Sequence, residues 1–280
     1  MPVTERFVIQ EVTPETLDAR YRFVRPLAKV TSGGYVYAAS HLHTQKPCAV
    51  KILDAGAPEK VRKRMFREME ALAAVQGPGV VDFRDAGEAD GRAYIVLELL
   101  EGRTLAGLLA AKGTLAVDQA MQVGAAIADV LARCHERGVV HRDIKPANVF
   151  VTTDEQVQLL DFGIAKLVDR ERKLEKLTQE NTLLGTPEYM APEALLMSPD
   201  VDERADQYSL GVTLYEALAG VVPYEGTYGE VLQSAMTKPL RSLRQLRPEV
   251  PGIVDDLITR SRRREPSDRY PSIADMGVAL

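Results

Sequence analysis

One segment constrains the possible fold and chemistry of this chain more than any other part of its sequence. It reads His141-Arg142-Asp143-Ile144-Lys145-Pro146-Ala147-Asn148, and Asp161-Phe162-Gly163 follows after a short apolar stretch. Phosphoryl transfer needs a group that accepts or orients the proton of the attacking hydroxyl, together with hard oxygen ligands for Mg²⁺ on the triphosphate. Asp143, Asn148 and Asp161 have the chemistry for these tasks. The segment therefore predicts a site that binds phosphate and magnesium.

The spacing of these residues resembles the catalytic loop and the magnesium-binding turn of the eukaryotic-type (Hanks-type) protein serine/threonine kinases, in their bacterial branch. A second motif, Gly185-Thr186-Pro187-Glu188-Tyr189-Met190-Ala191-Pro192-Glu193, closely resembles the end of the activation loop in the bacterial members. The resemblance runs from Tyr21 nearly to Leu280. It implies an α+β, two-lobed protein kinase-like fold, and an enzyme that transfers the γ-phosphate of Mg-ATP to serine or threonine hydroxyls of proteins.

The chain changes character near its first third, which favours two lobes. From Tyr21 to Glu98 the apolar runs are short and β-rich, with one helix predicted over about 58–74. Beyond Gly102 helical patterns dominate, at about 117–137, 205–218 and 254–264. We expect an N-terminal extension over 1–20 and a kinase domain over 21–280. Its expected parts are a small β-rich N-lobe at about 21–98, a hinge at about 98–102 and a larger helical C-lobe at about 103–280.

The resemblance assigns roles to the residues of the catalytic segment. Asp143 is expected to accept or orient the proton of the substrate hydroxyl, and Lys145 to neutralise charge that develops on the transferred phosphate. Asn148 and Asp161 are the expected metal ligands, for Mg²⁺ or in its place Mn²⁺, and they bind the nucleotide through the metal. His141 is expected to be structural, packed beneath Phe162, and not a proton acceptor.

Further nucleotide-binding residues are expected in the N-lobe and the hinge. Lys51 is expected to reach the α- and β-phosphates, oriented by Glu68 on the predicted helix, with Glu70 as the nearby competitor. The resemblance implies that the Glu98 carbonyl and the Leu100 amide pair with adenine, with Leu97 as the gatekeeper. Ala28, Gly34, Val36 and Ala49 complete the expected nucleotide-binding set.

The chain departs from the family at the glycine-rich turn, whose pattern is G-x-G-x-x-G-x-V. Here it reads Lys29-Val30-Thr31-Ser32-Gly33-Gly34-Tyr35-Val36, so only Gly34 matches. Thr31 is β-branched and stiff where a glycine would leave room for phosphate oxygens, so the turn can fold differently and nucleotide binding can be weaker. Lys29 either compensates as a cation directed at phosphate or is an ordinary solvated lysine.

A long polar segment between Asp161 and Ala191 resembles an activation loop. We expect phosphorylation at Thr178 or Thr182, because Arg142 offers a guanidinium group that can bind a phosphate. Thr186 is expected on the substrate-positioning loop, hydrogen-bonded near the catalytic residues.

Three further residues match the family in architectural positions. Asp206 begins a strongly apolar helix, where its carboxylate can accept backbone amides and hold the catalytic loop from beneath. Glu193 and Arg269 match a buried ion pair of the larger lobe, and we expect the loss of either to reduce stability before it affects chemistry.

The amino-acid composition limits the cellular compartment and the classes of partner that we expect. The formal charge of −5 gives no net basic field, so nucleic acid is not an expected partner. Two cysteines, Cys48 and Cys134, lie far apart in the sequence and favour a reducing cytoplasm. No apolar run is long enough to span a membrane, and the N-terminus has no signal-peptide pattern. The expected partners are protein substrates and, from the resemblance, a second copy bound through the N-lobe.

Two competing hypotheses stay open. A pseudokinase would use the same fold to bind a nucleotide or a partner without transferring phosphate, and the altered glycine-rich turn is its support. A small-molecule kinase is the other, and the well-matched loop around Thr186 weighs against it.

Overall fold

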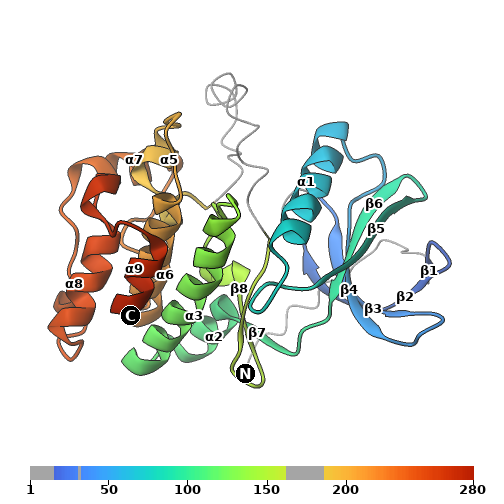
Figure 1. Cartoon of the computed structure of the whole chain (residues 1–280), viewed down its shortest axis with the longest axis horizontal. Coiled ribbons are helices and arrows are strands. Elements are labelled where there is room, and N and C mark those ends of the chain that lie inside the picture. The colour runs from blue at the N-terminus through green and yellow to red at the C-terminus, as the bar shows by residue number, and fades with distance from the viewer. Residues whose placement is uncertain (1–15, 31–32, 162–185) are drawn as a thin grey trace. The chain divides into compact units, whose positions relative to one another are not determined.

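The computed structural model describes residues 16–30, 33–161 and 186–280. Contacts within the chain divide it into two compact units (Figure 1). The first comprises Met1–Arg62 and Arg84–Leu99, and the second comprises Lys63–Phe83 and Leu100–Leu280.

The first unit is built on a six-stranded sheet with the strand order β1-β2-β3-β4-β6-β5. Its strands are β1 (Thr16–Leu17), β2 (Tyr21–Lys29), β3 (Tyr35–His41), β4 (Pro47–Ile52), β5 (Phe83–Ala89) and β6 (Arg92–Glu98). β1 lies inside the stretch expected as an N-terminal extension, yet it pairs with β2 and buries Leu17 in the core. The sheet therefore includes residues that precede Tyr21.

The pleat of this sheet sorts its side chains onto two faces. One face packs into a core cluster that includes Tyr37, Val50 and Val96, which lie directly opposite one another on β3, β4 and β6. The register of β2 shifts between Phe23 and Arg25 and again between Pro26 and Ala28, as expected of β-bulges. The two residues at these shifts, Val24 and Leu27, are exposed.

Helix α1 (Glu59–Val75) confirms the single helix predicted in the first third of the chain. It begins after Pro58 and buries Met65 and Leu72, two residues of the predicted apolar stripe. The contact division between the two units falls within α1, because Lys63 to Phe83 belongs to the second unit.

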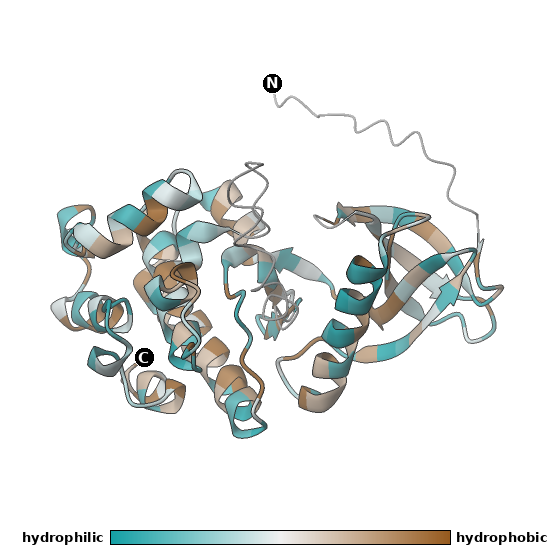
Figure 2. Cartoon of the chain, turned by 90° about the horizontal axis from the view of Figure 1, so that it is seen from above, coloured by the Kyte–Doolittle hydropathy of each residue, from teal (hydrophilic) through white to brown (hydrophobic). Residues whose placement is uncertain are grey.

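The second unit is mostly helical. Its helices are α2 (Leu105–Lys112), α3 (Val117–Glu136), α5 (Pro192–Leu195), α6 (Arg204–Ala219), α7 (Tyr228–Thr237), α8 (Gly252–Ser261) and α9 (Ile273–Ala279), with short 3-10 helices η1 (Pro146–Asn148), η3 (Pro187–Tyr189), η4 (Leu243–Gln245) and η5 (Pro266–Asp268). A small antiparallel sheet joins β7 (Gly102–Thr104), β8 (Val149–Thr152) and β9 (Val157–Leu159) in that order. Along both the strands of the first unit and the helices of the second, hydrophobic and hydrophilic residues are mixed (Figure 2).

Helix α6 is the centre of the second unit. Only Arg204, Glu216 and Ala219 of its sixteen residues are not buried, so the helix is enclosed on nearly every side. It ends where the sequence predicts, at Gly220, whose φ of 75° places it in the left-handed conformation that closes a helix. α8 ends at Ser261, earlier than the predicted Arg264.

Among the residues that the structure describes, none of the helices combines the length and the apolar character that a membrane span requires.

Candidate active site

The catalytic segment forms the connection between α3 and β8, and its polar side chains contact one another. The Lys145 Nζ atom lies 3.0 Å from Asp143 Oδ2, and the Asn148 Nδ2 atom donates to the same oxygen at 2.9 Å and to the Asp143 backbone carbonyl at 2.8 Å. Asp143 and Lys145 are about one-sixth exposed, so the pair is open to one side. The structure thus brings three predicted site residues into one hydrogen-bonded cluster.

Thr186 joins this cluster from the other motif. The Lys145 Nζ atom donates to Thr186 Oγ1 at 3.4 Å, so Lys145 lies between the carboxylate of Asp143 and a hydroxyl from the second motif. The expected hydrogen bond near the catalytic residues is confirmed. η3, which follows Thr186, holds this segment against α6, because Ser209 donates to the Tyr189 carbonyl at 2.8 Å.

His141 is fully buried and its two ring nitrogens have fixed partners. Its Nδ1 accepts a hydrogen bond from the Asp143 backbone N–H at 3.3 Å, and its Nε2 lies 3.1 Å from the Leu160 carbonyl. An Nδ1 that accepts and an Nε2 that must donate to a carbonyl define the neutral Nε2–H tautomer. The expectation that His141 is structural is confirmed by this placement.

Asp206, in the first turn of α6, holds the catalytic segment from below. Its Oδ2 accepts from the His141 backbone N–H at 2.9 Å, and its Oδ1 accepts from the Arg142 backbone N–H at 2.8 Å. Burial alone would raise the pKa of this carboxyl group, but the hydrogen bonds from His135 and from the Arg142 amide keep its pKa below the usual value. The predicted architectural role of Asp206 is confirmed.

His135 is a residue that the sequence reasoning missed. Its Nε2 lies 2.8 Å from Asp206 Oδ2, and it stands in the last turn of α3. Its sequence signal was weak: a histidine next to the buried Cys134 at the end of an apolar stripe. That pattern indicates a buried polar side chain but not its partner.

Two backbone conformations mark the site. Arg142 has a φ of 64° and Asp161 a φ of 43°, both in the left-handed region that residues other than glycine rarely adopt. Such conformations cluster at functional sites, where the surrounding structure holds them in place. For Arg142 that support is the hydrogen bond from its own N–H to Asp206.

The residues present fit a divalent metal. The Nδ2 atom of Asn148 is committed to Asp143, which leaves its Oδ1 as an oxygen donor. The Leu160 N–H donates to the Asn148 carbonyl at 2.9 Å, so the chain that carries Asp161 is attached beside Asn148. Asp161 is exposed. One amide oxygen and one carboxylate form the hard donor set that Mg²⁺ prefers.

The N-lobe residues predicted to bind nucleotide share one face of the six-stranded sheet. Val36 lies directly opposite Lys51 on the neighbouring strand, and Ala28 lies opposite Val36. Ala49, two residues before Lys51, points to the same side because side chains alternate along a strand. This face is the one opposite to the core cluster of Tyr37 and Val50.

The same register adds Leu97, the predicted gatekeeper, which lies opposite Ala49 on β6. Lys51 is 7% exposed, and both Lys51 and Glu68 have interaction partners. Because Lys51 and Glu68 belong to different units, their pairing stays a prediction. The adenine contacts assigned to Glu98 and Leu100, which also fall in different units, stay predictions too.

Gly34 has a structural reason to be glycine. Its φ is 113°, and a Cβ atom at this position would lie 2.2 Å from the Ile52 carbonyl oxygen. The Val30 N–H donates to the Gly34 carbonyl at 2.9 Å, so Val30 lies beside Gly34. The need for glycine at this position is therefore set by the backbone of β4, in addition to any approach of phosphate.

The ion pair expected between Glu193 and Arg269 is confirmed. It is bidentate, with Nη1–Oε1 at 2.6 Å and Nη2–Oε2 at 2.7 Å, and the Arg269 side chain is fully buried. The predicted phosphorylation sites Thr178 and Thr182, and Phe162 beside His141, lie outside the described residues.

The comparison with protein families matches residues 30–275 to the family described as "Protein kinase domain". Because this match covers most of the chain, the chain belongs to the protein kinase family, and the predicted two-lobed α+β fold class is confirmed.

Among known proteins, the chain is similar to the serine/threonine-protein kinases PknH and PknE of Mycobacterium bovis. It is 36% identical to PknH over 249 residues and 35% identical to PknE over 248 residues, which is 88% of this chain in both comparisons. A probable serine/threonine-protein kinase of Clostridium perfringens is 33% identical over 258 residues. The recognition of the bacterial branch is therefore confirmed.

The aligned region is 41% of the PknH chain and 43% of the PknE chain. The chain thus spans about two fifths of the length of these curated relatives.

Proposed function

We propose that this chain is an ATP-dependent protein serine/threonine kinase domain that transfers the γ-phosphate of Mg-ATP to hydroxyl groups of protein substrates. The observation that carries the proposal is the cluster of Asp143, Lys145 and Asn148, joined by Thr186. Each of the first three comes from one short segment, and each makes a hydrogen bond to another member of the cluster. The family membership and the names of the mycobacterial relatives support the same reaction class.

In this proposal Asp143 orients the substrate hydroxyl and accepts its proton as the phosphoryl group is transferred. The cation of Lys145, 3.0 Å from that carboxylate, is placed to balance negative charge on the transferred group. Thr186, held by Lys145, positions the substrate segment that carries the hydroxyl. Both ring nitrogens of His141 are engaged in hydrogen bonds, so His141 does not accept the proton. Asp143 is therefore the proton acceptor of the segment.

ATP and a divalent cation are the cofactors that a protein kinase domain implies. We assign Asn148 and Asp161 as the ligands of Mg²⁺, with Mn²⁺ as an alternative, and Lys51 with Glu68 to the phosphates. The metal, when bound, neutralises phosphate charge. Ala28, Gly34, Val36 and Ala49 would lie over the nucleotide, and the backbone of Glu98 and Leu100 would pair with adenine.

Phosphorylation of Thr178 or Thr182 is part of the proposal, with Arg142 as the residue that binds the phosphate. Phosphopeptide mapping of the active protein tests it, and active protein that carries neither modification contradicts it.

Several broader assignments are also proposals. They are the domain boundaries (an extension over 1–20 and a kinase domain over 21–280, with the hinge near 98–102), a homodimer through the N-lobe, and the absence of nucleic acid as a partner, which the charge of −5 supports. A cytoplasmic location is supported by the two cysteines, Cys48 and Cys134, both of which are free.

The test of the proposed reaction is transfer of label from γ-labelled ATP with Mg²⁺ to a generic basic protein. We expect Asp143→Asn to reduce transfer by roughly 10²–10⁴-fold, the range typical of a lost acid–base group. Lys51→Met is expected to abolish transfer while the protein stays folded.

A pseudokinase would show no label in the wild type either, and undiminished activity of Lys51→Met would mean that the phosphate-binding lysine is another residue. The altered glycine-rich turn is the observation on the side of the pseudokinase, and the presence of Lys51, Glu68, Asp143, Asn148 and Asp161 weighs against it.

A further inference from the structure

The part of the second unit from the end of α7 to the end of α8 has a charge opposite in sign to that of the whole chain. From Lys238 to Glu265 the sequence has eight basic and four acidic residues, in a chain with a formal net charge of −5. Five of the basic side chains are exposed and have no ion-pair or ring-stacking partner among the described residues. We call these five the basic surface: Lys238, Arg241, Arg244, Arg263 and Arg264.

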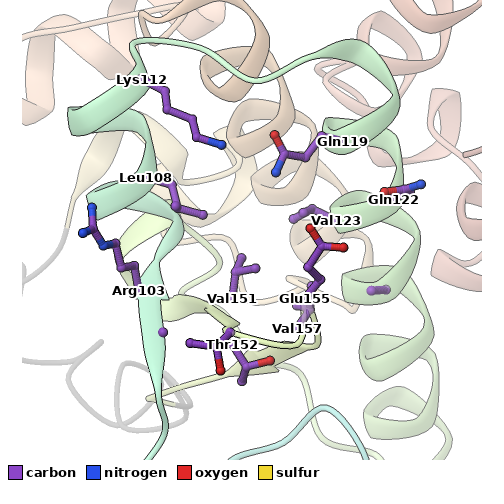
Figure 3. A pocket seen from close by; sticks show the side chains of 13 residues that line it. Arg103, Leu108, Lys112, Gln119, Gln122, Val123, Val151, Thr152, Glu155 and Val157 are labelled. Carbon is purple, nitrogen blue, oxygen red and sulfur yellow. The ribbon is translucent and has the colours of Figure 1, made fainter.

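A groove elsewhere in the second unit has charges of both signs. It has a volume of about 430 Å³, and Lys112 and Glu155 direct opposite charges over its rim (Figure 3). Opposite charges largely cancel at a distance, whereas the like charges of the basic surface add up. The basic surface therefore attracts a charged partner more strongly than the groove does.

Two hydrogen bonds bring the members of the basic surface together at the end of α8. The Arg264 Nε atom donates to the Ala235 carbonyl of α7 at 3.2 Å, three residues before Lys238. The Arg262 Nη2 atom donates to the Arg241 carbonyl at 3.2 Å. The segment that follows α7 therefore lies beside the segment that follows α8, although more than twenty residues separate them in the sequence.

The basic surface continues along α8 to the beginning of that helix. The Leu243 N–H donates to Asp255 Oδ1 at 2.8 Å, which holds η4 against α8. The Arg244 Nη1 atom lies 3.8 Å from the position that a Cβ atom of Gly252 would take, at the first residue of α8. The ten residues of α8 are about 15 Å long at 1.5 Å per residue, so the basic surface has roughly this extent. Figure 1 shows α8 and the segment that leads into it at one edge of the second unit.

A buried cation beneath the basic surface adds to its positive potential. Arg262 is 1% exposed, and its Nη1 atom is buried without a hydrogen-bond partner in the described part of the chain. Its guanidinium group stacks over the Tyr215 ring at 4.3 Å, and its other bonds go to carbonyl groups. Only the field of Asp255, a carboxylate that does not bond to it, offsets its charge. Such a charge acts over a longer range than an exposed one, because the interior screens it less than water does.

An exposed apolar side chain lies at the edge of the basic surface. Ile253 is 75% exposed and follows Gly252, at the end of α8 where Arg244 lies. Cations next to an apolar side chain are the combination found on proteins that lie on a membrane, where the cations meet headgroups and the apolar group enters the acyl boundary.

Two other anionic partners use this surface less completely. A single small anion would contact only one end of a surface that extends over roughly 15 Å. Nucleic acid presents phosphates to a basic surface, and its backbone offers no apolar layer to Ile253. A lipid surface engages both the cations and the isoleucine.

We propose that the basic surface, with Ile253 at its edge, binds a membrane that contains anionic phospholipids. Each basic residue close to such a membrane strengthens binding about fivefold. The net negative charge of more distant parts of the chain is largely screened, because the Debye length is about 8 Å at physiological ionic strength. Binding would hold the domain close to proteins at the same membrane. The inference does not depend on the proposed phosphoryl transfer.

The binding test is sedimentation of the full chain with vesicles of phosphatidylcholine alone or of phosphatidylcholine mixed with phosphatidylglycerol. We expect binding to the mixed vesicles only, and weaker binding as salt is added. The test variant combines Arg241→Gln, Arg244→Gln and Arg263→Gln. It is expected to weaken binding about 100-fold, the product of three fivefold effects. Among the described residues these three side chains make no hydrogen bonds, so circular dichroism should show an unchanged fold.

A matched control removes the same amount of charge from the first unit. It combines Arg22→Gln, Arg25→Gln and Lys46→Gln, three exposed residues outside the proposed nucleotide site. We expect it to bind the mixed vesicles as the wild type does. Equal weakening by the two triple variants would overturn the proposal, because net charge and not the basic surface would then decide binding.

The insertion of Ile253 has a spectroscopic test, because the chain contains no tryptophan. We expect the emission of Ile253→Trp to shift to shorter wavelength when mixed vesicles are added. Val24→Trp, at a position that is 67% exposed in the first unit, is the control and should not shift. The same response from both variants would overturn the assignment to a lipid surface.

Two further results would also overturn the proposal. The first is absence of wild-type binding to the mixed vesicles. The second is tighter binding to duplex DNA than to these vesicles, lost in the triple variant of the basic surface, which would identify nucleic acid as the partner.

Discussion

Replacement of Glu193 by glutamine tests how much the buried ion pair contributes to the stability of the second unit. Arg269 has five N–H donors, and all are used: two go to Glu193, and the others to the carbonyls of Arg204, Arg263 and Arg264. Glu193→Gln removes the only carboxylate in this set and directs an amide N–H₂ group towards a guanidinium. One donor then loses its acceptor, and a fully buried cation loses its counter-charge.

The expected cost is large because the pair is buried. Breaking a buried ion pair by removing one partner costs about 3–5 kcal/mol, a factor of roughly 150 to 5,000 in the folding equilibrium. At about 2–4 °C per kcal/mol for a domain near this size, the melting temperature is expected to fall by roughly 6–20 °C. This loss should precede any change in chemistry, since Glu193 does not contact the catalytic cluster through any of these bonds.

The assay is urea unfolding followed by circular dichroism, and the chain supplies a matched control. Arg247 and Glu249 form an ion pair of similar length, 2.8 Å, but the Glu249 side chain is 61% exposed. Glu249→Gln is therefore expected to leave the unfolding free energy near that of the wild type. Equal effects of the two substitutions would refute the reasoning, because burial is the difference between the pairs.

A second measurement separates the cost of an unpaired charge from the contribution of the pair. We expect Glu193→Met combined with Arg269→Met to be less destabilising than Glu193→Met alone, because the double variant leaves no buried charge. Additive effects of the two single substitutions would contradict this explanation.

Two further predictions concern the turn and the catalytic loop. Gly34→Ala is expected to destabilise the first unit by about 1–3 kcal/mol, because its Cβ would collide with the Ile52 carbonyl and φ is positive. The control is Gly56→Ala, which is also at positive φ but has open space around its Cβ. Equal losses of stability in thermal unfolding would refute the steric argument. The stabilisation from Asp206 is expected to be present above the pKa of an unfolded aspartate and to be lost as the pH falls through the lower pKa of the folded protein. Acid unfolding should therefore show the destabilising effect of Asp206→Asn shrink at low pH, and a constant difference across the acid range would contradict the lowered pKa.

The parts of the fold that the sequence predicts are those with strong periodicity or a definite end signal. α3 and α6 were predictable because their apolar patterns are long and Gly220 closes α6. β1 was not, because a strand of two residues has no periodicity of its own and depends on pairing with β2. The bulges of β2 were equally hidden, since a register shift is decided by the neighbouring strand.

The candidate site likewise contains features that the sequence predicts and features that depend on tertiary contacts. Asp206 could be assigned to backbone amides because it matches an architectural position of the family and begins a strongly apolar helix. Its second partner, His135, could not, because contact between α3 and α6 is a tertiary feature. The requirement for glycine at position 34 is also a tertiary feature, since the close approach of β4 depends on how the strands pair.

The attachment of the catalytic loop to α6 sets how rarely that loop can open. The backbone amide protons of His141 and Arg142 are bound by a carboxylate on a helix that is buried on nearly every side. Solvent can reach them only when the interior of the second unit separates, so their exchange with deuterium should be as slow as that of the α6 amides themselves. The catalytic segment, although part of a loop, would then open to solvent as rarely as the core of the second unit.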